Sequence, residues 1–119
     1  YVPLHALAPT CAAMITHGGP GTVLTTLAGG TPQLLSPNAH MFDTVLLSGL
    51  VEGAGAGRVV APDRLDAHTV TEGVRTLLED PRHTRAARAL REEMNAMPSP
   101  ADLAHTLTGA HTLTGLTRP

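Results

Sequence analysis

The chain has 119 residues, 42% of them hydrophobic and 15% charged, with a formal net charge of −2; these values describe one small globular domain without a basic surface for nucleic acid or anionic lipid. Its single cysteine, Cys11, excludes a disulfide framework and favours a reducing compartment, and no apolar run is long enough to cross a membrane. We therefore expect a cytoplasmic protein whose partners include neither nucleic acid nor a membrane.

Short apolar segments alternate along the chain with longer segments of helical periodicity. The predicted strands occupy residues 12–16, 33–36 and 58–61. The predicted helices occupy one turn at 3–8, then 21–28, 41–52, a segment that follows Asp66, 84–97 and a short segment within 97–103. Strands that alternate with helices across short glycine-containing loops predict an α/β fold with a parallel sheet. Three strands are few for such a sheet, so we expect an open edge.

Two of the predicted helices carry an apolar stripe at helical spacing. In the helix at 41–52 the stripe is Phe42, Val45, Leu46 and Leu50. In the helix that follows Asp66, its expected N-cap, the stripe is Val70, Val74, Leu77 and Leu78. The second stripe is typical of a helix that packs on a sheet.

The segment THGGPGT, residues 16–22, places one histidine and three glycines between a predicted strand and a predicted helix. Glycine costs conformational entropy on folding, so such a cluster indicates a sharp turn or a close approach of the backbone to a ligand. In a strand–turn–helix arrangement the first amide groups of the helix have no partner within the helix, and together with the helix dipole they form an anion site. The segment therefore predicts an anion-binding turn.

Three kinds of anion site use a glycine turn of this type. A phosphate-binding P-loop requires a lysine, and the chain contains none. A dinucleotide-binding fingerprint requires a third glycine where this chain has Leu24, with an acidic residue further along, so it matches poorly. The third kind uses the histidine of the motif itself.

The order HGGPGT resembles the donor-phosphate motif of nucleotide-sugar glycosyltransferases of the GT-B fold, in particular the bacterial family that glycosylates polyketides and other natural products. The likeness extends from VPLHALAPTCAAMITHGGPGTVLTTLAGGTPQLLSP through Phe42 and GAG to LREEMNAMPSPADL, and so covers residues 1 to about 103. It implies that the chain is the later half of the family's C-terminal domain, a partial Rossmann-like parallel sheet of about three strands with flanking helices.

The resemblance implies roles for the residues of the turn. His17 would contact the donor diphosphate, and Gly18, Gly19, Gly21 and Thr22 would supply backbone or hydroxyl donors. A diphosphate gains negative charge as the sugar leaves, so donors aimed at that charge lower the barrier. The alternative for His17 is a strand-end histidine whose ring only caps the turn.

Other positions of the resemblance concern the nucleoside and the sugar. Tyr1 and Val2 fall where the family often lines the base pocket, although Tyr1 is equally well a loop aromatic without a ligand. Relatives that use UDP-sugars often carry a glutamate at the position of Thr25, and a residue with one hydroxyl suits a deoxyribose, which favours dTDP. His40 and Met41 stand where many members have an Asp-Gln pair that binds sugar hydroxyls; this departure suits a deoxysugar or indicates a decayed site.

The resemblance also bears on cofactors and on the extent of the chain. It implies transfer without a metal or another cofactor, the nucleotide sugar being a co-substrate, and the histidines show no metal-like spacing. The chain begins at Tyr1 without a methionine and ends in a tandem AHTLTG, which suggests a fragment with a domain at 1–103 and a tail at 104–119. In the family the catalytic base and the acceptor pocket belong to an N-terminal domain, so no catalytic residue is expected in this chain.

Three functions remain open from the sequence. The first is the donor-binding part of an inverting glycosyltransferase that moves a deoxysugar from dTDP to a natural-product acceptor; the parent protein would be an enzyme and this chain alone would be inactive. The second is a non-catalytic remnant or accessory protein that binds a nucleoside diphosphate without transfer. The third, the weakest, is an unrelated α/β anion-binding module.

Overall fold

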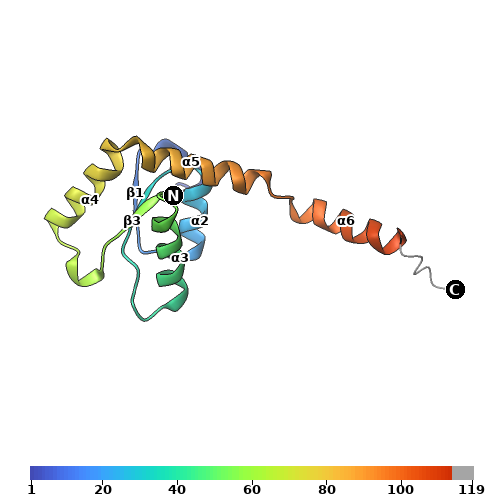
Figure 1. Cartoon of the computed structure of the whole chain (residues 1–119), viewed down its shortest axis with the longest axis horizontal. Helices are drawn as coiled ribbons and strands as arrows, with labels where there is room; N and C mark the ends of the chain where they lie inside the picture. Colours follow the sequence, from blue (N-terminus) through green and yellow to red (C-terminus); the bar gives the residue numbers. More distant parts are fainter. Residues whose placement is uncertain (114–119) are drawn as a thin grey trace.

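The structure is a computed structural model that describes residues 1–113, with side chains described as far as Gly109. Three strands form one sheet: β1 (Met14–Thr16), β2 (Gln33–Leu35) and β3 (Gly57–Val59). The α-helices, shown in Figure 1, are α1 (Leu4–Leu7), α2 (Pro20–Ala28), α3 (Phe42–Gly53), α4 (Ala67–Glu79), α5 (Pro81–Ala96) and α6 (Pro100–Leu113). Two short 3₁₀ helices are η1 (Ala8–Thr10) and η2 (Pro62–Arg64). Residues 114–119, which contain the end of the predicted tail, lie outside the described residues.

The sheet is parallel, with the strands in the order β1-β2-β3. Thr16 lies beside Leu35, and Leu35 lies beside Val59, so the carboxyl ends of all three strands meet at one edge of the sheet. Helix α2 connects β1 to β2 and helix α3 connects β2 to β3, each as a crossover between neighbouring parallel strands. The predicted α/β fold with three parallel strands is confirmed, and within the described residues β1 and β3 each have an unpaired edge.

The two faces of the sheet pack against different helices. Side chains from α2, α3 and α5 pack on the face that contains Leu35. The core of this face consists of Val23, Leu27, Leu35, Val51, Ala56 and Ala87. The opposite face contains Leu34 and packs against α4.

Glycine lets α4 approach the sheet closely, because a Cβ at Gly73 would lie 2.6 Å from Leu34 Cδ1. The predicted stripe of α4 is largely confirmed: Leu77 is buried against Leu34, and Val70 and Val74 are half-buried beside it. The stripe is wrong at Leu78, which is 54% exposed, because the last turn of α4 directs Leu77 toward the sheet instead.

Helix α3 faces the rest of the molecule with a side other than its apolar stripe. Its buried residues are Thr44, Ser48 and Val51. The predicted stripe is exposed instead, at Phe42 (79%), Val45 (43%), Leu46 (52%) and Leu50 (62%). Small side chains let α3 lie close to the glycine turn, since a Cβ at Gly18 would lie 2.5 Å from Ser48 Oγ. Close backbone approach therefore decides the orientation of α3 and leaves its apolar stripe on the surface.

Aspartate side chains begin the two helices that follow β3. Asp66 caps α4 as predicted: its Oδ1 accepts a hydrogen bond of 2.7 Å from the N–H of Thr69, and this bond lowers the pKa of Asp66. Asp80 caps α5 through the N–H of Arg82 at 3.0 Å, and hydrogen bonds from the Arg82 side chain lower the pKa of Asp80 to about 2. Because this cap precedes Pro81, which the first helical position tolerates, α5 begins earlier than predicted.

Helix α6 extends away from the sheet and the helices that cover it (Figure 1). It is longer than the short helix that the sequence predicts in this part of the chain. Ser99 and Asp102 form a capping box at the start of α6. The Ser99 N–H donates to Asp102 Oδ2 at 3.0 Å, and the Asp102 N–H donates to Ser99 Oγ at 3.1 Å. None of the helices within residues 1–113 is long and apolar enough to cross a membrane.

Candidate functional site

Strand β1 leads directly into the glycine turn, which then starts α2. Gly18 has φ +83°, in the left-handed region that favours glycine. Gly19 is the N-cap of α2, with φ −62° and ψ 137°, and Pro20 occupies the first helical position, where its missing N–H is no loss. The Gly-Gly-Pro sequence therefore turns the chain from strand to helix within a very short span.

Side chains lie against both of the first two glycines. A Cβ at Gly18 would lie 2.5 Å from Ser48 Oγ, and a Cβ at Gly19 would lie 2.6 Å from His17 Nε2. The His17 imidazole therefore lies directly over Gly19, and it is exposed to solvent. Ser48 Oγ is buried and has no hydrogen-bond partner in the part of the chain that the structure describes. The turn is thus enclosed between an exposed imidazole and a buried hydroxyl.

The first turn of α2 leaves hydrogen-bond donors open. Gly19 provides no side-chain cap, Pro20 has no N–H, and the N–H of Val23 bonds to Gly19 O at 2.9 Å. The N–H groups of Gly21 and Thr22 have no partner among residues 1–113. No described atom outside the neighbouring chain lies within 4 Å of a Cβ built on Gly21, so the side-chain position of Gly21 is open. Free N–H groups and the helix dipole together favour an anion at this point.

A cleft of about 620 Å³ lies at the carboxyl ends of the strands, beside His17. Its lining residues are Ile15, Thr16, His17, Ser36, Asn38, Pro62 and Leu65, which follow or end all three strands. Ligands of open parallel sheets bind in this place, outside the carboxyl ends of the strands. His17 borders both the cleft and the open end of α2, so an elongated ligand with an anionic part fits the two together.

A buried polar network lies beneath the turn. Gln33, the first residue of β2, is fully buried. Its Oε1 accepts a hydrogen bond from Thr16 Oγ1 at 3.2 Å, and its Nε2 donates to Val23 O at 3.2 Å. This network was not predicted from the sequence; its signal is a glutamine where a buried parallel strand ordinarily has an apolar residue.

The residues that the resemblance assigns to the diphosphate are contiguous in space. They form the turn and the first helical positions of α2: His17, Gly18, Gly19, Gly21 and Thr22. This geometry suits an anion, and the individual roles stay predictions.

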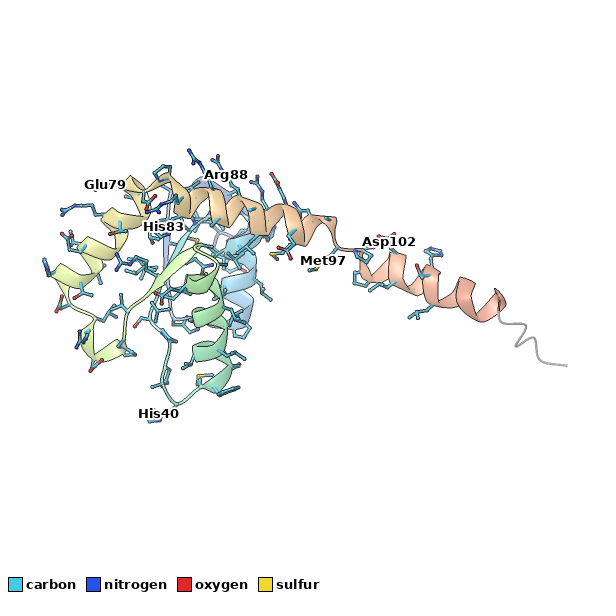
Figure 2. The ribbon with its side chains drawn as sticks, viewed as in Figure 1. His40, Glu79, His83, Arg88, Met97 and Asp102 are labelled. Carbon is cyan, nitrogen blue, oxygen red and sulfur yellow. The ribbon has the colours of Figure 1, made fainter. Side chains whose placement is uncertain are left out.

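The residues that the resemblance assigns to the nucleoside and the sugar do not line the cleft. Tyr1 and Val2 are exposed before α1, and Thr25 is half-buried on α2, beyond its open first turn. His40 and Met41 are exposed in the loop before α3, and Figure 2 shows His40 at the far end of this loop, directed away from the sheet. The roles of these five residues stay predictions.

Asn38 lines the cleft, unlike His40 and Met41, the two residues predicted for the sugar. Its Oδ1 accepts a hydrogen bond of 3.0 Å from the backbone N–H of His40. Asn38 was not among the predicted site residues, although a polar residue just after a predicted strand of a parallel sheet falls at the edge where ligands bind.

The fold and the site together define a class of structure: part of a Rossmann-like α/β domain, with a cleft and an uncapped helix N-terminus at the carboxyl edge of a parallel sheet. The chain belongs to the family described as the erythromycin biosynthesis protein CIII-like, C-terminal domain, which it matches over residues 1–109. The match confirms the resemblance to the natural-product glycosyltransferases, and the fold is that of their GT-B C-terminal domains.

Related glycosyltransferases align with most of this chain in sequence or in structure. Tylactone mycaminosyltransferase from Streptomyces fradiae is 45% identical over 103 residues, which are 87% of this chain and 22% of that protein. Spinosyn forosaminyltransferase SpnP has a TM-score of 0.85 and 32% identity, over 92% of this chain and 29% of its own. Spinosyn rhamnosyltransferase SpnG complexed with thymidine diphosphate has a TM-score of 0.82 and 36% identity, over 90% of this chain and 29% of its own. The chain spans less than a third of the length of each of these proteins.

Proposed function

We propose that this chain is the donor-binding part of a glycosyltransferase that moves a deoxysugar from dTDP to a natural-product acceptor. The observation that carries the proposal is the open N-terminus of α2, where the free N–H groups of Gly21 and Thr22 lie beside His17 and the cleft. The names of the relatives support the substrate class, since one is a tylactone mycaminosyltransferase and another was solved with thymidine diphosphate.

In the proposed reaction an acceptor hydroxyl attacks the anomeric carbon of the sugar from the side opposite to the diphosphate. The bond between that carbon and the diphosphate oxygen breaks, and dTDP leaves with the bonding electrons. Its negative charge therefore grows in the transition state. The N–H groups of Gly21 and Thr22 and an imidazole N–H of His17 are oriented before the reaction and stabilise that charge. We assign the base that takes the acceptor proton, and the acceptor pocket, to the rest of a longer protein.

We also propose that the transfer needs no metal ion or other cofactor. The positive potential at the N-terminus of α2 and the His17 donor supply the stabilisation that a metal ion supplies in other phosphate sites. Among residues 1–109, whose side chains the structure describes, no group of three or more His, Cys, Asp or Glu side chains is placed to hold a metal ion. We place the reaction in the cytoplasm, which suits a chain with one cysteine.

Binding and transfer by the full-length protein that contains this chain test the proposal. We expect dTDP to bind about tenfold or more tightly than dTMP in calorimetry, because dTMP lacks the second phosphate and its charge-assisted hydrogen bonds. Hydrogen exchange should show protection of residues 17–23 by dTDP. Sugar transfer from a dTDP-deoxysugar to a polyketide aglycone completes the test.

Each outcome decides between the functions that the sequence left open. Binding of dTDP without transfer or donor hydrolysis would favour the accessory or remnant function. Equal affinity for dTDP and dTMP, with no protection of the turn, would contradict the proposed diphosphate site.

A further inference from the structure

We propose that Gln33 is a positioning residue that holds the two ends of the glycine turn in place for a diphosphate. The identity of the ligand rests on the proposed function. The positioning itself rests on the buried hydrogen bonds of Gln33, which the structure shows without any ligand.

One side chain spans the whole turn. Thr16, which donates to Gln33 Oε1, immediately precedes His17. Val23, whose carbonyl accepts from Gln33 Nε2, immediately follows Thr22. A carbonyl oxygen only accepts hydrogen bonds, so the amide nitrogen must face Val23 and the amide oxygen must face Thr16. Both bonds are therefore made in a single orientation of the side chain.

The surroundings of Gln33 leave it little freedom. The residue lies in the central strand, between Met14 of β1 and Gly57 of β3. A Cβ at Gly57 would lie 2.5 Å from Gln33 O, so β3 is packed directly against this backbone. The Gln33 side chain is 0% exposed, and a buried amide is costly unless it is hydrogen-bonded. An apolar side chain would suit this position in a buried parallel strand, so the glutamine indicates a use for its two bonds.

The consequence concerns the donors of the proposed site. His17 and the free N–H groups of Gly21 and Thr22 all lie between the two residues that Gln33 holds. With both ends fixed, the turn loses less conformational freedom when an anion binds, and affinity rises without any contact between Gln33 and the ligand.

The test compares Gln33→Met with a matched control in the full-length protein. Gln33→Met replaces the amide side chain by an apolar side chain of similar length, which removes both hydrogen bonds. The control is Thr31→Val, which removes another buried hydrogen bond, from Thr31 Oγ1 to Ala8 O at 2.6 Å, away from the turn. Thr16→Val and Thr16→Ser test the same network from its other end, because serine retains the hydroxyl.

Hydrogen exchange of the free protein and calorimetry with dTDP are the measurements. We expect the amide of Val23, which is hydrogen-bonded to Gly19 O, to exchange about tenfold faster in Gln33→Met and Thr16→Val. The Kd for dTDP should rise about threefold to tenfold in Gln33→Met, the range of one lost neutral hydrogen bond. Thr31→Val should lower the melting temperature without either change, and Thr16→Ser should retain the exchange rates of the unsubstituted protein.

The outcomes separate the inference from the proposed function. The inference would be overturned if Gln33→Met and Thr16→Val lower the melting temperature, as Thr31→Val does, but leave hydrogen exchange in the turn unchanged. If Gln33→Met does not fold, the comparison of Thr16→Val with Thr16→Ser decides the same question. Failure of the unsubstituted protein to bind dTDP would contradict the proposed function, whereas the exchange rates of the free protein would still decide the role of Gln33.

Discussion

At the scale of single residues, His17 stands where the cleft meets the N-terminus of α2. In the full-length protein we expect His17→Ala to lower kcat by about 10² to 10³, about 2.7–4 kcal/mol, the effect of removing one donor to a developing charge. Because this charge grows as the sugar leaves, kcat should fall more than the affinity for dTDP. Steady-state kinetics with a dTDP-deoxysugar, together with calorimetry, measure both quantities.

His17→Gln is the control for this prediction, because its amide still donates a hydrogen bond and should restore part of kcat. If His17→Ala leaves kcat within about threefold of the unsubstituted enzyme, far less than the loss of such a donor, the imidazole only caps the turn.

In the same turn, Gly18 lies close to the buried hydroxyl of Ser48. We expect Ser48→Ala to raise the free energy of unfolding by about 1 kcal/mol, because it removes a buried hydroxyl that has no partner in residues 1–113. Gly18→Ala should be strongly destabilising, since it adds a close contact with Ser48 Oγ to the strain of a positive φ. In the Ser48→Ala background only the strain should remain, about 1–2 kcal/mol. A double-mutant cycle in urea measures the coupling; equal costs in both backgrounds would show that the contact with Ser48 is unimportant.

At the scale of elements, α3 is the helix that leaves its apolar stripe exposed. Leu46 is 52% exposed, so Leu46→Glu should change the free energy of unfolding by less than about 0.5 kcal/mol. Val51→Ala, on the buried side of the same helix, should cost about 2 kcal/mol through lost burial and the cavity that it leaves. Denaturant unfolding of the full-length protein measures both. A large loss for Leu46→Glu would mean that another part of that protein covers the apolar stripe.

The elements themselves were predictable because their signals are local. Alternation of apolar strands with periodic helices, and turn residues between them, specify the α/β order within short windows of sequence. The Asp66 cap is equally local, since it depends on one side chain and the N–H of Thr69. The orientation of a helix against its neighbours is not set by local sequence alone. Phe42, Leu46 and Leu50 form a helical stripe in the sequence, but the side chain of Ser48 and the backbone carbonyl of Thr44 lie against Gly18, and this close packing sets the orientation of the helix.

At the scale of the whole molecule, the part of the site that was predicted depends on local sequence, and the rest depends on contacts between distant segments. The turn at 16–22 was predictable because its glycines, proline and histidine are adjacent in the chain. The cleft is built from the ends of three strands, so Asn38 and Leu65 join it only through the register of the sheet. Gln33 reaches the turn in the same way. No spacing in the sequence predicts that its amide meets Thr16 and Val23.

The position of the imidazole over Gly19 has a consequence for directed evolution of this site. The side chains of residues 17 and 19 compete for one volume, since a Cβ at position 19 would lie 2.6 Å from His17 Nε2. A library that varies position 19 alone would therefore mostly displace the histidine, and its losses would be wrongly attributed to the glycine. Randomising the two positions together samples combinations in which a smaller residue at 17 accompanies a larger one at 19. Such pairs change the shape of the turn but lose the His17 donor, so a screen of this library should score binding of the leaving group separately from the rate of transfer.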